Sequence, residues 1–595
     1  MLSRVRGRVL LSVAGVVGAV VLVFAVAAPP EHCPEVTADE LRASAAATVD
    51  WFVRNQDDAG RWLYEYHRAG GPVDTGYNEV RHAGVTSGLY QAATAGIPGA
   101  LESADRGLAW ARDHLLTGDG WTAMETSSGV PAGASALLLA ALVERRETTG
   151  DEQYDELARQ LGQFLVGQVE ASGAVLSHFD PSTGRPVPER YSKYYTGEAY
   201  WALARLHTAF PDGPWGETAD RIGHYLATER DEAEGLFPPI PDHWAGYGLA
   251  VTTTFPERDA DEPLTDDELA YARRQAGLFG AQVRFVSQRM GPWGALVRTR
   301  HEPRGGGYGV LGEGLTGLWL AAEADERLAD VRGPIADRVV CNAGLAIAAQ
   351  ADDEDADAFA EPGKVAGAWF RDDITRMDDM QHALSALLRT IPVLEAAERS
   401  DGDGSTEQAP SPWLWLAVLV VALNPVRAAL GTPRAARGRR EVATIAALGG
   451  AAGSVVVMLV ALVGGPFADW IDVSDSSLRI AAGVVGVIAG IVDLFRPAPS
   501  PEPSMAGRRA WLVPVAVPFV IRPALLVLAM SAVADRGAWV VVGGLLVAVG
   551  VLVALAWWTS PEGVTGRVLR WTSRLAAVTL AAGSVLLVIN GVLDV

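Results

Sequence analysis

The stretch Tyr77–Gly84 brings three kinds of reactive side chain into four residues. Glu79 supplies a carboxylate, Arg81 a guanidinium and His82 an imidazole, where a polar loop gives way to an apolar helical pattern. Residues three apart on a helix share a face, so Glu79 and His82 can meet while Arg81 points elsewhere. A carboxylate beside an imidazole can move protons, but alone the stretch is more typical of a polar first turn.

Other predicted helix starts repeat this composition. Asp378 lies four residues before His382 and Asp379 three residues before it, so a helix would place each acid on the face of the imidazole. Tyr194 and Glu198 repeat the four-residue spacing. The other candidates at such starts are Tyr195, Asp242, His243, Trp244, Tyr308 and Glu313. Five of the six starts therefore bring an acid, which favours a shared cavity.

Aromatic rings together with paired carboxylates suit carbohydrate chemistry. The rings stack on sugar faces, while one acid protonates the leaving oxygen and another activates water or attacks. The predicted catalytic residues are Glu79, His82, Glu198, Asp378, Asp379 and His382. The predicted substrate-binding residues are Arg81, Tyr194, Tyr195, Asp242, His243, Trp244, Tyr308 and Glu313. The acid/base pair is expected to be Asp379 with either Glu198 or Glu79.

Each of these signals also has a structural interpretation. The helix dipole favours acids in a first turn whatever the function. Tyrosine and tryptophan at loop ends often cap a core, and a single histidine is commonly a satisfied core residue. The hypothesis of a functional cavity therefore depends on the coincidence of several starts.

No metal and no cofactor are expected. The cysteines and histidines do not follow the spacing of a zinc site. Neither a P-loop nor a dinucleotide fingerprint follows a predicted strand. The run Gly305–Gly307 is expected to be a flexible loop.

The elements that must position these residues are six predicted helical hairpins between residues 38 and 398. Each hairpin has an amphipathic helix, a loop rich in glycine and aromatic residues, and a more apolar helix. The expected helices are 39–56 and 79–95, 100–116 and 133–148, 151–170 and 195–209, 215–230 and 243–254, 265–289 and 310–324, and 331–351 and 377–396. Six such units predict an all-α (α/α)6 toroid with the second helices as an inner barrel. An open superhelix of helix pairs is the alternative.

The hairpin pattern resembles that of six-hairpin glycan-active enzymes, namely glycoside hydrolases, sugar epimerases and polysaccharide lyases of (α/α)6 form. Terpenoid cyclases are a more distant likeness. The resemblance covers residues 38–398 at the level of architecture. It implies a hydrolase, lyase or epimerase, and it carries no catalytic signature from which a residue's role could be taken.

Residues 31–411 are strongly acidic, with 62 Asp and Glu against 32 Lys and Arg. Such a surface repels nucleic acid, so no nucleic-acid partner is expected. The only cysteines, Cys33 and Cys341, both lie in this region. If the region is outside the cytoplasm, they can form a disulfide between the start of the domain and its last repeat. Two separate buried thiols are the alternative.

Apolar runs predict membrane segments on both sides of the acidic region. Residues 9–28 follow three arginines and are long enough to span a bilayer as a signal anchor or signal peptide. Six further spans are predicted near 413–430, 442–464, 478–495, 511–533, 538–558 and 575–593. Arginine-rich loops alternate with arginine-poor loops, so the positive-inside rule predicts a multi-pass plasma-membrane protein with residues 31–411 and the C-terminus outside the cytoplasm.

Three polar residues in the apolar region indicate a path through the membrane: Asn424, Asp493 and Arg522. A charge at bilayer depth is costly and usually faces the interior of a bundle. The segment Leu423–Arg427 and the proline-punctuated fourth span resemble the LysE/MarC-type exporter superfamily, although Arg522 stands where a small residue is expected before proline. An ion pair between Arg522 and Asp493 is the structural alternative.

The predicted chain thus has four parts. These are a signal segment at 1–30, a toroid at 31–400, a linker at 401–412 and a six-span domain at 413–595. The predicted function is a membrane-anchored, extracytoplasmic enzyme acting on a cell-envelope glycan or glycolipid. The alternative is an envelope glycolipid exporter or scaffold whose toroid binds its ligand without transforming it.

Overall fold

The computed structural model is predominantly helical. It describes residues 31–72, 76–236, 239–290, 303–400, 410–433, 438–470, 473–496, 512, 515–516, 520–558 and 563–593. The chain divides into two compact units. The ring unit is formed mainly by residues 33–287 and 299–406, and the apolar-helix unit mainly by residues 407–594. The predicted helix at 9–28 and most of the predicted linker lie outside the described residues.

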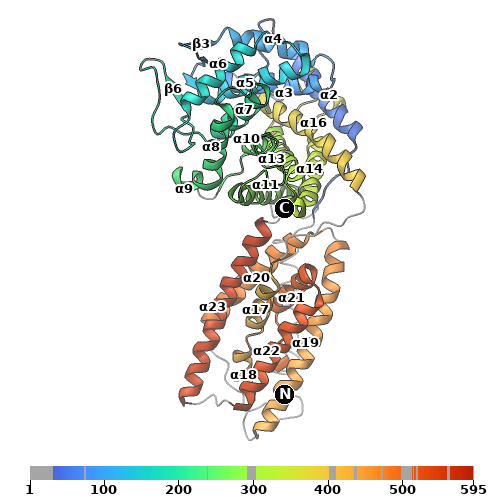
Figure 1. The fold of residues 1–595 in the computed structure, drawn as a ribbon. Coiled ribbons are helices and arrows are strands. Elements are labelled where there is room, and N and C mark those ends of the chain that lie inside the picture. Colours follow the sequence, from blue (N-terminus) through green and yellow to red (C-terminus); the bar gives the residue numbers. More distant parts are fainter. Residues whose placement is uncertain are drawn as a thin grey trace. The chain divides into compact units, whose positions relative to one another are not determined.

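Six successive helical hairpins build the ring unit (Figure 1). The hairpins are α2 (Ala38–Arg54) with α3 (Glu79–Thr94), α4 (Ala100–Arg112) with α5 (Ala132–Thr149), α6 (Asp155–Gln168) with α7 (Tyr195–Ala209), α8 (Trp215–Thr228) with α10 (His243–Thr252), α11 (Asp266–Met290) with α13 (Gly305–Ala324), and α14 (Ala329–Ala349) with α16 (Met377–Ser400). The connections add α9 (Arg230–Ala233), α15 (Asp353–Ala356), η2 (Glu326–Leu328) and η3 (Pro362–Lys364). Every predicted helix overlaps its observed counterpart.

The second helices of the hairpins form a closed inner ring. In order, α3 packs on α5, α5 on α7, α7 on α10, α10 on α13 and α13 on α16, and α16 returns to α3. Outer helices cover this ring: α4 packs on α3, α6 on α5, α8 on α7 and α14 on α13. The order of contacts is that of the predicted (α/α)6 arrangement, and the contact of α16 with α3 excludes the open superhelix.

The composition of the helices explains which of them are inside. In α5 every residue from Ala132 to Arg145 is buried, as expected for a helix with apolar and small residues all round. In α6 the buried residues form one stripe that includes Ala158, Leu161 and Leu165, at the spacing of a single helix face. The inner helices therefore have neighbours on all sides, while the outer helices turn one face to water.

Glycines allow neighbouring inner helices to approach closely. A Cβ built on Gly309 of α13 would lie 2.2 Å from the carbonyl carbon of His382 in α16. One built on Gly317 of α13 would lie 2.6 Å from the carbonyl carbon of Gly246 in α10. A side chain cannot occupy either space, so α13 meets both neighbours at these distances only because glycine stands at the contacts.

Two further links connect the first hairpin with the last. Strand β1 (Glu65–His67) pairs antiparallel with β8 (Ile374–Arg376), placing Glu65 opposite Arg376. Cys33, just before α2, and Cys341 in α14 form a disulfide. Both links span more than 300 residues of sequence and hold the ends of the ring unit together.

Short strands lie in the loops, which the all-α expectation did not include. They form the sheets β2–β1–β8, β3–β4 and β5–β6–β7. The remaining strands are β2 (Gly71–Pro72), β3 (Leu115–Thr117), β4 (Thr122–Met124), β5 (Val130–Pro131), β6 (His178–Asp180) and β7 (Arg185–Pro186). Segments of two or three residues are too short to show the alternation from which a strand is predicted.

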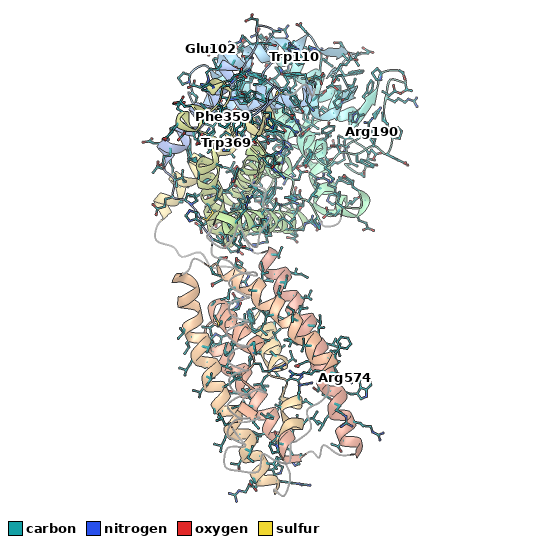
Figure 2. The ribbon with its side chains drawn as sticks, turned by 180° about the vertical axis from the view of Figure 1, so that it is seen from behind. Glu102, Trp110, Arg190, Phe359, Trp369 and Arg574 are labelled. Atoms are coloured by element: carbon teal, nitrogen blue, oxygen red, sulfur yellow. A yellow bond between two sulfur atoms is a disulfide. The ribbon has the colours of Figure 1, made fainter. Side chains whose placement is uncertain are left out.

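The aromatic residues that recur in the loops serve the core. Trp62 is buried and donates from Nε1 to the Ser103 hydroxyl at 3.2 Å. Trp369 (Figure 2) is also buried and donates from Nε1 to the Ala346 carbonyl oxygen at 2.7 Å. A buried indole needs a hydrogen-bond acceptor, and each of these finds one in an outer helix.

The apolar-helix unit contains helices long enough for a bilayer. Its helices are α17 (Pro412–Leu423), α18 (Pro425–Gly431), α19 (Arg439–Trp470), α20 (Asp475–Phe495), α21 (Pro523–Arg536), α22 (Ala538–Trp558) and α23 (Gly563–Leu593). Five stretches of the described chain could cross a membrane by length and composition: 412–431, 439–464, 475–495, 538–558 and 565–592. Large apolar side chains such as Leu546 and Trp558 are exposed on this unit, which suits contact with lipid.

The fourth predicted span, 511–533, is not among these five. Its described helix, α21, has 14 residues, which is too short to cross a bilayer by itself. Most of the residues at the start of this span lie outside the described part of the chain. Five of the six predicted spans are therefore supported.

Replacing Gly309 with alanine should destabilise the ring unit. The new Cβ would meet backbone atoms of His382, which cannot rotate away, and overpacking costs about 1–3 kcal/mol. Gly167, near the end of α6, faces open space, so Gly167→Ala should instead stabilise by up to about 1 kcal/mol. Thermal unfolding of the full-length variants checks this. An unchanged melting temperature for Gly309→Ala would contradict the close packing of α13 on α16.

Candidate active site

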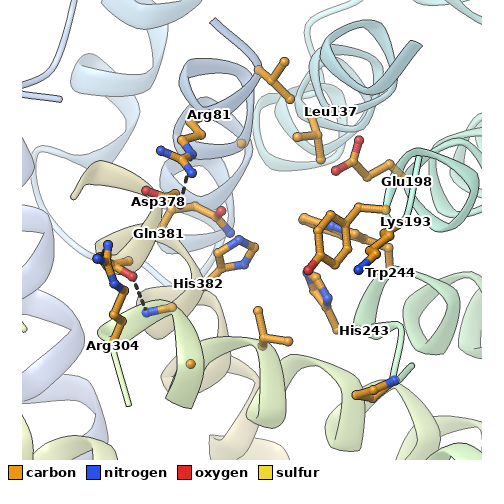
Figure 3. Close-up of a pocket in the computed structure, with 18 of the residues that line it drawn as sticks. Arg81, Leu137, Lys193, Glu198, His243, Trp244, Arg304, Asp378, Gln381 and His382 are labelled. Carbon is orange, nitrogen blue, oxygen red and sulfur yellow. Dashed lines mark hydrogen bonds and ion pairs between the residues drawn. The ribbon is translucent and has the colours of Figure 1, made fainter. Parts of the chain in front are cut away.

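The starts of the inner helices surround a cavity of about 720 Å³ in the ring unit (Figure 3). Most of its lining lies at or next to the starts of five inner helices: Asn78, Val80 and Arg81; Lys193–Tyr195 and Glu198; His243 and Trp244; Pro303, Arg304, Gly306, Gly307 and Val310; and Asp378, Asp379, Gln381 and His382. Leu137 of α5, Gln282 of α11 and Arg371 also contribute. Because every inner helix begins at the same end of the ring, residues far apart in the sequence meet there.

Nine of the fourteen predicted site residues line this cavity. They are Arg81, Tyr194, Tyr195, Glu198, His243, Trp244, Asp378, Asp379 and His382. The other five, which do not belong to the lining, are Glu79, His82, Asp242, Tyr308 and Glu313. Whether the nine act on a substrate stays a prediction, but the structure brings them together.

His82 lies in the core behind the cavity. Its Nε2 donates to the Gly107 carbonyl at 2.8 Å, so its Nδ1 accepts from the Tyr77 hydroxyl at 2.7 Å. The ring packs against Trp62 and Trp110. Burial lowers the pKa of His82 to about 3, which keeps the imidazole neutral. Both nitrogens are thus engaged within the protein, and the predicted catalytic role of His82 finds no support in the geometry.

Three other predicted residues support the fold around the cavity. Glu79 accepts hydrogen bonds from the backbone N–H and the hydroxyl of Ser127, at 3.1 and 3.2 Å. Asp242 caps α10 and pairs with Arg230 at 2.6 Å. Tyr308 is buried in the core. For these three, the structural interpretation of a polar or aromatic helix start describes the observed contacts.

Glu313 lies behind the lining and joins two of its histidines. Nδ1 of His382 donates to Oε2 of Glu313 at 2.6 Å, and Nε2 of His243 is 3.7 Å from the same oxygen. Gln381 donates to the other carboxylate oxygen at 3.3 Å. The Glu313 side chain has no exposed surface. A buried carboxylate needs a partner of opposite charge, and His382 is placed to be that partner.

The two histidines prefer opposite protonation states. Burial lowers the pKa of His382, but the charge and hydrogen bond of Glu313 outweigh it, so the pKa lies above its ordinary value of 6.5. Burial and then the charge of His382 hold the pKa of His243 well below that value. The ring centroids are 5.1 Å apart. Near pH 6.5 the site therefore holds an imidazolium beside a neutral imidazole, which is an acid beside a base.

Two carboxyl groups of the lining favour the protonated form. Burial, with a smaller effect of the Asp242 charge, raises the pKa of Glu198 to about 8. Burial, followed by the charge of Asp378, raises the pKa of Asp379 to about 6. Asp378 itself pairs with Arg81 at 3.0 Å. At neutral pH Glu198 is therefore a hydrogen-bond donor, and its Oε2 has no partner among the described residues.

Aromatic rings form a wall beside the histidines. Trp244 stacks on Trp201 with ring centroids 5.2 Å apart, and its own ring lies 5.7 Å from that of His382. Tyr194 is 49% exposed, with its ring 6.4 Å from that of His243. Trp244 is thus fixed by the core, while Tyr194 is accessible at the cavity.

The positions of His243, Glu313 and His382 would also suit a metal ion, a grouping that the prediction of no metal site did not consider. One ligand atom from each lies within 4.8 Å of the others. Two imidazoles and a carboxylate are a donor set of catalytic zinc sites. The three residues come from α10, α13 and α16, so no local spacing reveals them. A metal ion on this set would compete with the proton that joins His382 to Glu313.

The cavity holds three cations that were not predicted from the sequence: Lys193, Arg304 and Arg371. Arg304 precedes Gly305–Gly307, which forms the first turn of α13 and not a loop. A Cβ on Gly306 would lie 2.8 Å from Oδ1 of Asp379, so glycine is needed where the helix start meets α16. The sequence feature that could have identified Arg304 as a site residue is its position directly before the start of a helix.

In the apolar-helix unit, the predicted path residues Asn424, Asp493 and Arg522 lie together. Arg522 pairs with Asp493 and donates to the Ala422 carbonyl at 2.9 Å. Asn424 takes a left-handed conformation with φ 49° and interrupts the helix between α17 and α18. These contacts agree with the structural alternative, an ion pair beside a broken helix. The role in a membrane path stays a prediction.

Comparisons with known proteins give structural likeness only. No family model matches the chain, and no curated protein matches it. A cellobiose 2-epimerase from Spirochaeta thermophila is similar at a TM-score of 0.44 and 15% identity, covering 61% of this chain and 98% of that one. A glycoside hydrolase family 76 mannosidase from Bacteroides thetaiotaomicron has a TM-score of 0.41 and 13% identity, covering 61% and 99%. A D-mannose isomerase has a TM-score of 0.40 and 14% identity, covering 60% and 97%.

The raised pKa of Glu198 predicts a pH-dependent stability. Between about 4.5 and about 8 an unfolded glutamate loses the proton that the folded state keeps, so this group lowers stability as pH rises. Glu198→Gln should therefore lose less stability than the wild type from pH 5 to pH 8. Glu217→Gln, on the exposed face of α8, should follow the wild type. Melting temperatures across this range check it, and parallel profiles for all three proteins would contradict the buried, protonated Glu198.

Proposed function

We propose that the ring unit is an isomerase or epimerase of a reducing sugar, in which His243 and His382 transfer protons at the carbon next to the sugar carbonyl. The observation that carries the proposal is the pairing of two cavity-lining imidazoles with opposite protonation preferences, 5.1 Å apart between ring centroids. Proton abstraction beside a carbonyl needs an unprotonated base at the carbon and a protonated acid that returns a proton, so each histidine must hold its own protonation state at the working pH.

The proposed reaction uses the two histidines in turn. Neutral His243 removes the proton from the carbon next to the carbonyl, leaving an enediolate. The imidazolium of His382 then returns a proton through Nε2, since its Nδ1 is occupied by Glu313. Return to the same carbon from the opposite face gives the epimer. For the isomer, His382 protonates the carbonyl oxygen, protonated His243 returns its proton to the former carbonyl carbon, and the hydroxyl of the other carbon gives its proton to His382 as it becomes the new carbonyl, which yields the ketose or aldose. The proton count is unchanged in both cases.

Glu313 acts in this scheme through His382. A buried carboxylate bonded to Nδ1 fixes the tautomer and the orientation of the ring and favours its charged form. Glu198, protonated at neutral pH, is a donor for the carbonyl oxygen or a hydroxyl of the sugar. Trp244 supplies an apolar face of the kind that stacks on sugar rings.

A glycoside hydrolase is the second candidate. Glu198 with a pKa of about 8 suits the acid that protonates a leaving oxygen, and Asp379 is the second carboxyl group of the lining. This was the acid/base chemistry predicted from the sequence. It is ranked second because it leaves the pair of histidines and the buried Glu313 without a chemical part.

We further propose that the ring unit faces the outside of the cell, anchored by the apolar-helix unit. The support is the alternation of arginine-rich and arginine-poor connections between the apolar segments, together with the disulfide between Cys33 and Cys341. A cell-envelope glycan or glycolipid would then be the source of the sugar.

The proposed reaction can be followed by NMR in D2O with the full-length protein in detergent. Wild type should exchange the hydrogen next to the carbonyl of mannose, glucose or cellobiose for deuterium while the epimer or ketose forms. His243→Asn and His382→Asn should each lower the rate about 100-fold or more, because each removes a general acid or base. His224→Asn, on the exposed face of α8, should leave the rate unchanged.

Other outcomes of this assay discriminate between the candidates. New reducing ends without deuterium incorporation would favour the hydrolase. Turnover that is lost after dialysis against EDTA and restored by zinc would assign His243, Glu313 and His382 to a metal ion. Unaltered deuterium exchange in both histidine variants would overturn the proposed acid/base pair.

The pH dependence of the rate gives a second test. Activity should need neutral His243 and charged His382, so the acid limb should lie well below 6.5 and the alkaline limb above it. Glu313→Gln removes the charge that raises the pKa of His382 and should move the alkaline limb to lower pH. Equal melting temperatures would show that the variant is folded. An alkaline limb that stays in place would assign it to another group, such as Glu198, and would contradict the role given to Glu313.

A further inference from the structure

The cavity contains cations with few partners, in a domain where carboxylates are abundant. Residues 31–411 hold 62 acidic residues against 32 basic ones. Some arginines of the ring unit pair closely with two carboxylates: Arg145 pairs with Asp105 and Asp151, and Arg258 pairs with Asp220 and Glu268. Others, such as Arg68 and Arg273, pair closely with one. A cavity-lining arginine whose only carboxylate contacts are longer than a hydrogen bond is therefore a candidate to contact a ligand.

Arg304 and Arg371 are two such cations. Arg304 has one ion pair, with Asp379 at 3.8 Å, and its buried Nη1 has no hydrogen-bond partner among the described residues. Arg371 is 3.6 Å from Asp372, whose side chain is 61% exposed, and its buried Nε also lacks a partner in the described chain. Both distances exceed that of a hydrogen bond, so two guanidinium groups face the cavity with donors to spare.

Both arginines lie near the start of α13. Arg304 is its N-cap residue, and Trp369, two residues before Arg371, packs against Gly305 in the first turn. The N-terminus of this 20-residue helix adds partial positive charge at the same end of the cavity. Asp379 also lies here and accepts from the Gly306 N–H at 3.1 Å, but its second oxygen, Oδ2, has no hydrogen-bond partner among the described residues.

We propose that this end of the cavity binds an anionic group on the sugar substrate, a carboxylate or a phosphate or sulfate ester, with Arg304 as its main contact and Arg371 as the second. The inference deepens the proposed function and rests on it. The planar guanidinium matches such groups with two parallel hydrogen bonds. The ligand would take the position next to Arg304 that Oδ2 of Asp379 now holds loosely at 3.8 Å.

The negative charge of the domain strengthens the argument that these arginines bind an anion. A surface with a large excess of carboxylates repels small anions, so an anionic sugar is bound only if local cations override that field. A neutral sugar would need no additional guanidinium donor, and leaving buried N–H groups such as those at Nη1 of Arg304 and Nε of Arg371 without a hydrogen bond carries a desolvation cost. Another cation of the lining, Lys193, lies across the cavity from Arg304 in Figure 3 and serves for comparison.

The test compares matched sugars in the deuterium-exchange assay. Neutral glucose and mannose are set against glucuronate and mannuronate, which carry a carboxylate, and against their 6-phosphates. Wild type should use one anionic series with a kcat/KM at least tenfold above that of the neutral series. Arg304→Gln should lower this anionic-to-neutral ratio about tenfold, the usual value of one charge-assisted hydrogen bond. The series that is preferred tells a carboxylate from a phosphate.

Two charge-matched variants serve as controls. Lys193→Gln removes a positive charge from the opposite side of the cavity and should lower the ratio less than Arg304→Gln does. Arg332→Gln removes one outside the cavity, where the half-buried side chain pairs with Glu323 and Glu326, and should leave the ratio unchanged. An equal loss in all three variants would mean that only net charge matters and would overturn the site at Arg304.

The remaining outcomes separate this inference from the proposed function. Turnover of neutral sugars that equals or exceeds turnover of anionic ones overturns the anionic site and leaves the isomerase proposal intact. Failure to convert any of the sugars overturns the isomerase proposal, and calorimetric titration of the full chain with glucuronate and glucose 6-phosphate then decides the anionic site. Binding that is lost in Arg304→Gln supports it, and the absence of binding overturns it.

Discussion

Closing a ring of six buried helices is the constraint on which the other features of the ring unit depend. Each inner helix has neighbours on both sides and an outer helix behind it, so a polar group inside the ring must find its partner on a neighbouring helix. Closure also sets how near the starts of the inner helices come to each other. Because α13 meets α10 and α16 through glycines, Glu313 of α13 reaches His382 on one neighbour and comes within 3.7 Å of His243 on the other.

The same burial then acts on acids and on imidazoles in opposite directions. Removing a group from water favours its neutral form, which raises the pKa of Glu198 and lowers that of His243. His382 differs from His243 because it donates to a carboxylate that has no exposed surface. The buried charge of Glu313 thus gives the two histidines different pKa values, and an acid/base pair requires such a difference.

The helices could be predicted from the sequence because their signals are local. The apolar periodicity of each segment predicted the helices of the hairpins, and the repetition of six similar hairpins indicated a ring. The side-chain directions at the helix starts could not be predicted in the same way. Glu79 and His82 have the same spacing as Asp379 and His382, yet α3 turns His82 into the core and Arg81 to the cavity, while α16 turns His382 to the cavity. That rotation is fixed by packing on neighbouring helices. The approach of His243, Glu313 and His382 likewise arises only when three hairpins close on one another.

The negative charge of the domain surface and the positive charge in its cavity act over different distances. The excess of carboxylates produces a field that extends about a Debye length, near 10 Å, and opposes the approach of long polyanions. Arg304 and Arg371 act over a few ångströms, inside a cavity where water screens less. The two effects are therefore compatible. A small anionic sugar meets the weak outer repulsion with one charge and gains the close contacts, whereas a polyanionic chain meets the outer repulsion along its whole length and can place only one unit in the cavity. If the cavity binds an anionic sugar as proposed, the acidic surface and the cationic end of the cavity would together select for a terminal or free sugar.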